Sequence, residues 1–217
     1  MSQDMLVLLA EALWETTYMV AISTLIATAL GIPLGVILVT TGKGHILENL
    51  PVNHSLGAIV NATRSTPFII LMVAIIPLTR IIVGTSIGTN AAIVPLSIAA
   101  IPFVGRVVES ALKEVDHGVI EAAQAMGASP REIISKVLLP EALPSVILGL
   151  TLTVISLIGY SAMAGAIGGG GLGDLAIRYG YQRFRADIML ATVVILIAQV
   201  QVVQSCGDYL ARRLNKK

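Results

Sequence analysis

Long, uninterrupted apolar runs are the feature that most constrains how this chain can fold. The chain has 217 residues, of which 55% are hydrophobic and only 12% are charged, and its mean hydropathy is +0.86. A soluble domain carries roughly 25% charged residues. The runs are about 20 residues long and do not alternate between apolar and polar positions, which favours spanning helices over a membrane barrel. We therefore predict an all-α integral membrane protein.

Five transmembrane helices are expected, within a single transmembrane domain over residues 1–217. The expected spans cover about 16–40, 56–80, 89–110, 142–166 and 187–207. Each is long enough to cross a hydrocarbon core of about 30 Å, because a helix rises about 1.5 Å per residue. In the second span, Arg64 and Arg80 must lie near the ends, reach the interface or face protein. Prolines inside the spans, such as Pro67 and Pro77, imply kinks.

The distribution of basic residues favours an N-terminus outside the cytoplasm and a C-terminus inside it. In this orientation the outer loops contain Arg80, Arg178, Arg183 and Arg185. The cytoplasmic side contains Lys43, Arg64, Arg106, Lys113, Arg131, Lys136, Arg212, Arg213, Lys216 and Lys217. Cytoplasmic loops are enriched in Lys and Arg, so the larger second group supports this orientation, although the cluster at 178–185 opposes it. An odd number of spans agrees with termini on opposite sides.

The loop between the third and fourth spans has strong local signals for two short helices. Asp116 can cap a first helix, and Gly127 can end that helix in the left-handed conformation. Ser129, Pro130 and Glu132 then form a second helix start, in which Ser129 caps, Pro130 takes the first helical position and Glu132 completes a capping box. The loop is therefore expected to be a helix, a sharp turn and a second helix.

The same loop carries a motif with fixed residue types and fixed spacing. Glu121-Ala122-Ala123 is followed by three residues, Gly127, nine residues and then Val137-Leu138-Leu139-Pro140. Because proline cannot continue a helix with ordinary hydrogen bonding, Pro140 should stop or kink the second helix before the fourth span. An amphipathic interfacial helix is the alternative interpretation of such a loop.

This motif resembles the EAA loop of the permeases of binding-protein-dependent ABC importers, with Val137 as a conservative change in its last element. The segments 16–20, 64–71 and 168–184 resemble the methionine branch of these permeases, so that the resemblance covers nearly the whole chain. It implies a type I importer permease fold, with five transmembrane helices per subunit and a cytoplasmic coupling helix. We call residues 116–140 the coupling segment.

The resemblance also implies the partners and the mechanism. Two copies of the permease would assemble with two ATP-binding subunits in a bacterial inner (cytoplasmic) membrane, in contact with lipid. An extracytoplasmic binding protein would deliver methionine, in the L and D forms, for uptake by alternating access. The residues expected to couple the permease to the ATPase are Glu121, Ala122, Ala123, Met126, Gly127, Ser129 and Pro130. ATP and Mg would be bound by the ATPase subunit, so this chain would have no catalytic residues.

Other ligand classes have little support in the sequence. Residues 168–173 match G-x-G-x-x-G, but no strand precedes them and no βαβ unit surrounds them, so they are interpreted as glycines that end the fourth span and allow close packing. The chain is therefore not expected to bind ATP or another cofactor. His45, His54 and His117 show no metal-ligand spacing, so no metal site is expected. The net charge of +1 gives no indication of nucleic-acid binding.

A stripe of small and polar residues marks one face of the fourth span. Gly149, Thr153, Ser156, Tyr160 and Met163 follow one another at spacings of four, three, four and three residues. Such a stripe faces protein rather than lipid, and helix–helix packing is one explanation. The other is a solute pathway lined by Ser156, Tyr160 and Met163, which would combine hydroxyl groups with an adaptable apolar surface.

Two other functions remain open from the residues. A permease of the same type that carries another small solute has the same sequence features. An ion-coupled secondary transporter would be expected to show internal repeats and a buried ionisable group. No internal repeat is found, and the acidic residues of the spans lie near their ends.

Overall fold

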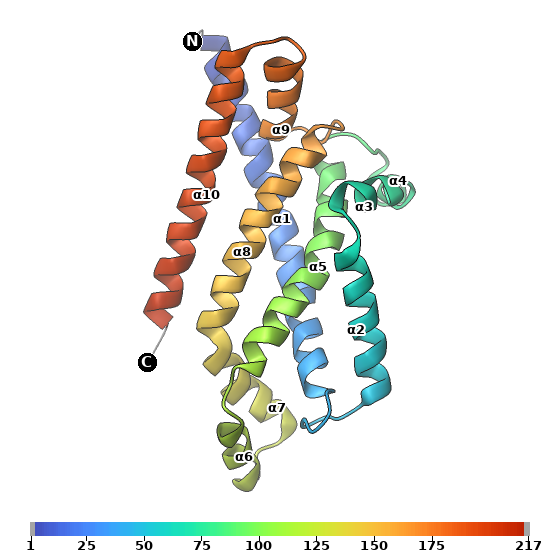
Figure 1. The fold of residues 1–217 in the computed structure, drawn as a ribbon, viewed down its shortest axis with the longest axis vertical. Coiled ribbons are helices and arrows are strands. Elements are labelled where there is room, and N and C mark those ends of the chain that lie inside the picture. The colour runs from blue at the N-terminus through green and yellow to red at the C-terminus, as the bar shows by residue number, and fades with distance from the viewer. Residues whose placement is uncertain (1–2, 215–217) are drawn as a thin grey trace.

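Four long helices form the body of the molecule in the computed structural model, which describes residues 3–214. They are α1 (Gln3–Thr40), α5 (Thr89–Lys113), α8 (Leu139–Gly165) and α10 (Ala186–Leu214). Figure 1 shows them side by side along the long axis of the molecule. Within residues 3–214, four helical stretches are long and apolar enough to cross a membrane, or five if the bent pair α2–α3 crosses as one span. All the described secondary structure is helical, as predicted.

Glycines allow the long helices to pack closely. A Cβ atom at Gly31 or Gly35 of α1 would lie 2.6 Å from a side-chain carbon of α5. A Cβ atom at Gly149 of α8 would lie 2.0 Å from Val107 of α5. A Cβ atom at Gly207 of α10 would similarly meet Thr151 of α8. Small residues at membrane helix interfaces let backbones approach in this way, so α1, α5, α8 and α10 form one close-packed body.

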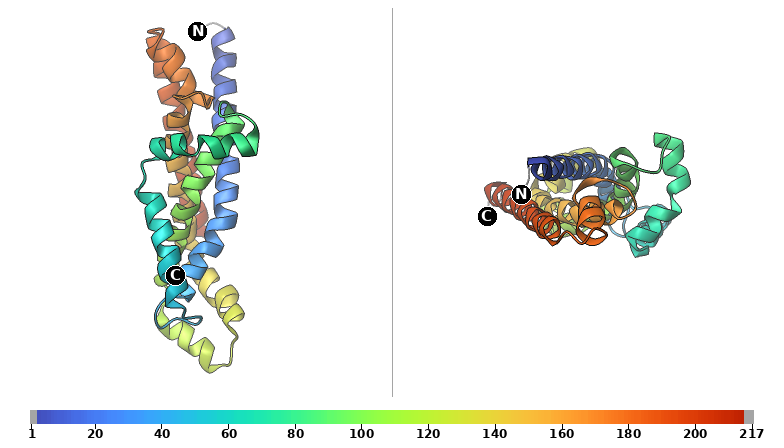
Figure 2. Two further views of the ribbon diagram at one scale, coloured as in Figure 1. Left: turned by 90° about the vertical axis from the view of Figure 1, so that its right-hand side faces the viewer. Right: turned by 90° about the horizontal axis from the view of Figure 1, so that it is seen from above.

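The second expected span is not one straight helix. Instead, α2 (Leu50–Ser65) is followed by α3 (Phe68–Ala74), with a bend of 103° between them, and by α4 (Ile76–Val83). Pro67 disfavours the helical conformation of the residue before it, and Thr66 is accordingly extended, with φ −83° and ψ 124°. Figure 2 shows α3 and α4 running across the direction of the long helices. The kink predicted at Pro67 is confirmed as this bend, and a membrane crossing over 56–80 stays a prediction.

The other spans differ from expectation mainly at their ends. The helix α1 begins at Gln3 rather than near Thr16, and α10 continues to Leu214 rather than ending near Gly207. Both extensions are in sequence that is more polar than the spans, and helix termini are poorly fixed by hydropathy. The two ends of the described chain lie at opposite ends of the bundle, with α6 at the same end as the last turns of α10 (Figure 1).

The coupling segment contains α6 (His117–Ala125), α7 (Pro130–Glu132) and a π-helical stretch, Ile133–Leu138. Of the two effects predicted for Pro140, a stop or a kink, the stop is wrong, because helix continues from Pro130 to Gly165. Pro140 has no N–H, so it cannot make the α-helical bond to the preceding turn. The chain takes the wider π pattern there, and the N–H of Leu139 donates to the C=O of Ile134. The coupling segment is thus directly continuous with α8.

The glycine-rich segment after α8 folds back into the bundle. It contains α9 (Gly171–Leu175) and a second π-helical stretch, Ala176–Tyr181. The N–H of Gly171 donates to the carboxylate of Glu15 at 2.6 Å, and the N–H of Leu172 donates to Thr16 Oγ1 at 2.9 Å. A Cβ atom at Gly165 would lie 2.4 Å from the backbone nitrogen of Asp174. The expectation that these glycines permit close packing is confirmed.

Candidate coupling segment and pathway pocket

Backbone and side-chain caps fix both ends of α6. The carboxylate of Asp116 accepts a hydrogen bond from the N–H of Gly118 at 2.7 Å. At the other end, Gly127 has a φ of +81°, and its N–H donates to the C=O of Gln124. The N–H of Ala128 donates to the C=O of Ala123 at 3.1 Å. These two bonds make a Schellman motif, so the predicted cap and the predicted left-handed glycine are confirmed.

The second short helix of the coupling segment, α7, begins with the predicted capping box. Ser129 Oγ accepts from the N–H of Glu132, and the carboxylate of Glu132 accepts from the N–H of Ser129. Lys136 donates to the same carboxylate at 3.0 Å. Hydrogen bonds from Lys136 and Ser129 lower the pKa of Glu132 to about 2. The carboxylate is therefore ionised at neutral pH and acts as an acceptor for both Lys136 and the Ser129 N–H.

The candidate coupling residues are mostly on the outer face of the coupling segment. Ala123 is buried and anchors α6 to the body of the molecule. The other six are exposed: Glu121, Ala122, Met126, Gly127, Ser129 and Pro130. Met126, the C-cap residue of α6, is 82% exposed. A large apolar side chain so exposed at the end of a bundle, next to exposed Ala122, suits contact with a partner protein.

A charge cluster around one buried carboxylate lies on α5 near the coupling segment. Glu109 is buried and forms ion pairs with Arg106 and Lys113, the latter at 2.7 Å. Arg106 also donates to Asn61 of α2 at 2.8 Å. A buried carboxylate with two basic partners is locally compensated, so the cluster joins α2 to α5 without an unpaired charge.

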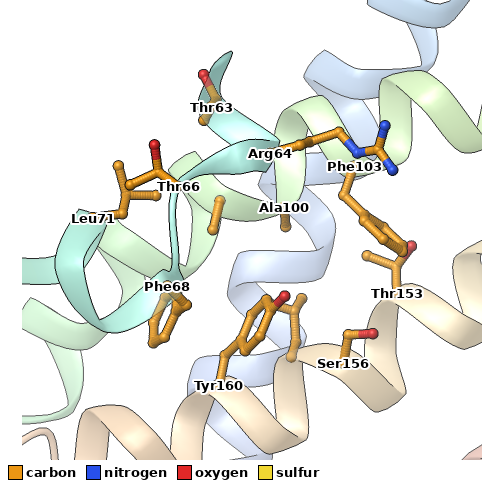
Figure 3. A pocket seen from close by; sticks show the side chains of 12 residues that line it. Thr63, Arg64, Thr66, Phe68, Leu71, Ala100, Phe103, Thr153, Ser156 and Tyr160 are labelled. Atoms are coloured by element: carbon orange, nitrogen blue, oxygen red, sulfur yellow. The ribbon is translucent and has the colours of Figure 1, made fainter. Parts of the chain in front are cut away.

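A pocket of about 140 Å³ lies between the α2–α3 corner, α5 and α8. Its wall includes Thr63, Arg64, Thr66, Phe68, Leu71, Ala99, Ala100, Phe103, Thr153, Ser156, Leu157 and Tyr160. Figure 3 shows Arg64 beside Phe103 on one side and Tyr160 beside Phe68 on the other. The rings of Phe68 and Tyr160 stack with their centroids 4.6 Å apart, and the Arg64 guanidinium lies 5.8 Å from the centroid of Phe103.

The structure separates the expected pathway residues. Ser156 and Tyr160 line the pocket, whereas Met163 does not and is 46% exposed elsewhere on α8. Gly149, on the same stripe, instead contacts Val107. The stripe therefore serves packing near Gly149 and a pocket near Tyr160. The helical period predicted a shared face, but only the part of that face with Thr153, Ser156 and Tyr160 lines the pocket.

Sequence reasoning missed the pocket residues from outside α8. Arg64 is predicted above to lie near a span end and on the cytoplasmic side, and neither Phe68 nor Phe103 is predicted to line a site. The available signal was a basic residue three positions before a proline within an apolar run, since an intramembrane charge marks a functional site by default. Within residues 3–214, no group of three His, Cys, Asp or Glu side chains is placed to hold a metal ion.

Comparison with known proteins gives the family of this chain. A family model described as binding-protein-dependent transport system inner membrane component matches residues 31–217. A probable D-methionine transport system permease protein MetI of Vibrio cholerae is 62% identical over 210 residues, or 97% of this chain and 93% of that protein. The D-methionine transport system permease protein MetI of Escherichia coli K12 is 52% identical over 165 residues, or 76% of each chain.

Solved structures agree with these relatives. A chain from a structure of inward-facing conformations of the MetNI methionine ABC transporter has a TM-score of 0.98 and 48% identity, and all of both chains is covered. A chain of an amino acid ABC transporter solved with histidines has a TM-score of 0.78 at 19% identity, over 98% of this chain and 100% of that one, which indicates a shared fold alone. The chain belongs to the family of binding-protein-dependent transport system inner membrane components.

Proposed function

We propose that this chain is the permease subunit of an ATP-driven importer that moves L- and D-methionine into the cytoplasm. Two relatives described as D-methionine permeases are 62% and 52% identical to it. A chain from the MetNI methionine ABC transporter has nearly the same backbone. Identity at this level over most of the chain supports the same solute more strongly than another small solute.

The observation that carries the proposal is the exposed, doubly capped coupling segment. Its inner face is held by buried Ala123 and Ile133, while Met126 points outward at the end of the bundle. A pore without a motor has no need of such a projection. We propose that six exposed residues contact the ATPase subunit: Glu121, Ala122, Met126, Gly127, Ser129 and Pro130. Buried Ala123 would hold α6 against the body of the molecule and so keep these residues in place.

The complex would contain two copies of this chain, two ATPase subunits and an extracytoplasmic methionine-binding protein. ATP and Mg would be bound by the ATPase subunits, since hydrolysis in this family belongs to the partner. The chain would lie in the bacterial inner membrane with its N-terminus outside. The excess of basic residues on the other side supports this orientation, and so does the placement of α6 at the opposite end of the bundle from Gln3 (Figure 1).

The continuity of α7 with α8 supports a direct mechanical route from ATPase to pathway. A displacement of the coupling segment would move α8 without passing through a flexible linker, because helix runs from Pro130 to Gly165. Ser156 and Tyr160 lie on that helix and line the pocket. Alternating access would then be a rigid-body movement of α8 against α2, α3 and α5, driven by the ATPase cycle. Met163, on the same helix, would move with them.

The proposal is tested by reconstitution. The permease, its ATPase and its binding protein are placed in proteoliposomes, and uptake of labelled L- and D-methionine is measured with ATP and with a non-hydrolysable analogue. We expect uptake of both forms only with ATP and binding protein. Uptake driven by an ion gradient without ATP would contradict the proposal. ATP-dependent uptake of a different solute, with none of methionine, would contradict the choice of substrate.

A further inference from the structure

Two hydrogen bonds hold the start of α9 against α1, at the end of the bundle opposite the coupling segment, which we call the outer end (Figure 1). The carboxylate of Glu15 accepts from the N–H of Gly171 at 2.6 Å, and Thr16 Oγ1 accepts from the N–H of Leu172 at 2.9 Å. Thr16 and Leu172 are buried, and Glu15 is half-buried. The first N–H groups of a helix have no partner within that helix, so side chains of α1 cap α9.

The charge of Glu15 is directed at this contact. Among the side chains of residues 3–214, no Lys, Arg or His forms an ion pair with Glu15. A Cβ atom at Gly170 would lie 2.8 Å from the same carboxylate oxygen, so glycine lets the chain pass close to it. A hydrogen bond to an ionised acceptor is roughly twice as strong as one between neutral groups. The bond from Gly171 is thus the stronger of the two, and it depends on one charge.

Direct backbone contact fixes α9 to the outer end of α8. A Cβ atom at Gly165 of α8 would overlap the backbone of Asp174, and one at Gly173 of α9 would overlap the backbone of Ala162. With no side chain between them, the two backbones cannot slide past each other without a clash. A movement of the outer end of α8 therefore carries α9 with it.

The contact between α9 and α1 is of a different kind. Besides the two hydrogen bonds, it includes an apolar cluster with Met5, Leu9 and Ala12 of α1 and Leu172 and Leu175 of α9. Apolar attraction is not directional, so these side chains can shift without losing it, whereas a hydrogen bond is lost with its geometry. When α8 moves, the outer end can therefore part between α1 and α9.

We propose that Glu15 is a positioning residue of the transport cycle. With Thr16, it holds α9, and so the outer end of α8, against α1 in a conformation whose backbone is nearly that of a chain from inward-facing MetNI. Because helix runs from Pro130 to Gly165, movement of the coupling segment reaches these two bonds, which we call the outer latch. Opening of the outer end breaks the outer latch, and return to the inward-facing state re-forms it. The inference rests on the proposed alternating access and adds residues that hold one of its two states.

A contact that exists in one state only sets the balance between the two states. Glu15→Gln keeps the length of the side chain and an acceptor oxygen but removes the charge. Replacing a charge-assisted bond with a neutral one should shift the balance toward the outward-open state by about fivefold to tenfold. Because the ATPase cycle drives this opening in the proposed mechanism, ATP hydrolysis without binding protein should rise by a similar factor.

The outer latch is tested by ATP hydrolysis of the permease–ATPase complex in proteoliposomes. We expect Glu15→Gln to raise hydrolysis without binding protein by about fivefold to tenfold and to leave the rate at saturating binding protein unchanged. Thr16→Val removes the acceptor of Leu172 at similar side-chain volume and should act in the same direction. Glu11, one turn earlier in α1, is exposed, and Glu11→Gln is the control with no expected change.

Hydrogen exchange distinguishes the outer latch from a bond that only stabilises the fold. Peptides with Gly171 and Leu172 should exchange slowly in the wild-type complex without nucleotide. They should exchange faster when a non-hydrolysable ATP analogue and the binding protein are both present. In Glu15→Gln, exchange without nucleotide should already be faster, while peptides from the middle of α5 stay unchanged.

Unchanged hydrolysis without binding protein, per assembled complex, in either Glu15→Gln or Thr16→Val would overturn the outer latch, whatever the yield of complex. Exchange at Gly171 that does not respond to nucleotide and binding protein would also overturn it. The uptake measurement separates this failure from failure of the proposed function. ATP-dependent methionine uptake by the wild type, with either of these results, would reject the outer latch and keep the importer. Absence of ATP-dependent uptake by the wild type would reject the importer on which the inference rests.

Discussion

Gly127 shows how a single residue shapes the surface offered to a partner. Its φ is +81°, and a Cβ atom there would have nothing within 4 Å. The backbone conformation, rather than lack of space, therefore requires glycine. The Schellman motif that Gly127 closes decides the direction in which the chain leaves α6 and hence the position of Ser129.

Replacing Gly127 tests this requirement with a matched pair. A left-handed conformation costs a residue with a Cβ atom roughly 1–2 kcal/mol, whereas Asn adopts it more readily. We expect Gly127→Val to reduce the amount of ATPase that co-purifies with the permease and Gly127→Asn to retain most of it. Equal recovery of ATPase with both variants would argue against a conformational role for this residue.

The capping box predicts a pH dependence at Ser129 and Glu132. The pKa of Glu132 is lowered from 4.5 to about 2 by Lys136 and Ser129. A lowered pKa means that the box stabilises the segment above pH 4.5 and loses this contribution as pH falls from 4.5 toward 2. Hydrogen exchange of residues 129–133, corrected for intrinsic rates, should show constant protection between pH 8 and 5.5. A loss of protection near pH 6 would contradict the assignment.

At the scale of elements, the contact between α5 and α8 depends on the absence of one side chain. A Cβ atom at Gly149 would lie 2.0 Å from Val107 Cγ1, whereas one at Gly159, also in α8, would have nothing within 4 Å. Gly149→Ala should destabilise the permease by about 1–3 kcal/mol, as overpacking does. Gly159→Ala should be neutral or slightly stabilising, since Ala is the better helix former. Thermal unfolding in detergent compares the two, and similar melting temperatures would contradict this view of the interface.

The same elements show what local sequence can predict. Caps at Asp116, Gly127 and Ser129 depend on neighbours within four residues, so they were predictable. The 103° bend after α2 was not, because Pro67 fixes the break but the packing of α3 against α5 and α8 sets the direction. For the same reason, the sequence predicts the pocket residues of α8 but not those of the other helices. Tyr160 followed from a helical period within α8, whereas Arg64 enters from a separate helix.

At the scale of the whole molecule, the two ends of the bundle should face different compartments. Asp4→Cys at the start of α1 should react with an impermeant thiol reagent added outside intact cells, and Leu47→Cys should react only after permeabilisation. Both are made with Cys206→Ala, because Cys206 is exposed. The opposite pattern would place the coupling segment outside, away from any cytoplasmic ATPase.

The account centres on contact between the coupling segment and an ATPase, and a photo-crosslinker at Met126 tests that contact most directly. Met126 is 82% exposed, and Trp14, on the distant half of α1, is 69% exposed and serves as the control position. In membranes that contain the complete transporter, the crosslinker at position 126 should join the permease to the ATPase subunit, and the one at position 14 should not. A crosslink from position 126 to the binding protein, or none to the ATPase in a complex that transports methionine, would contradict the account.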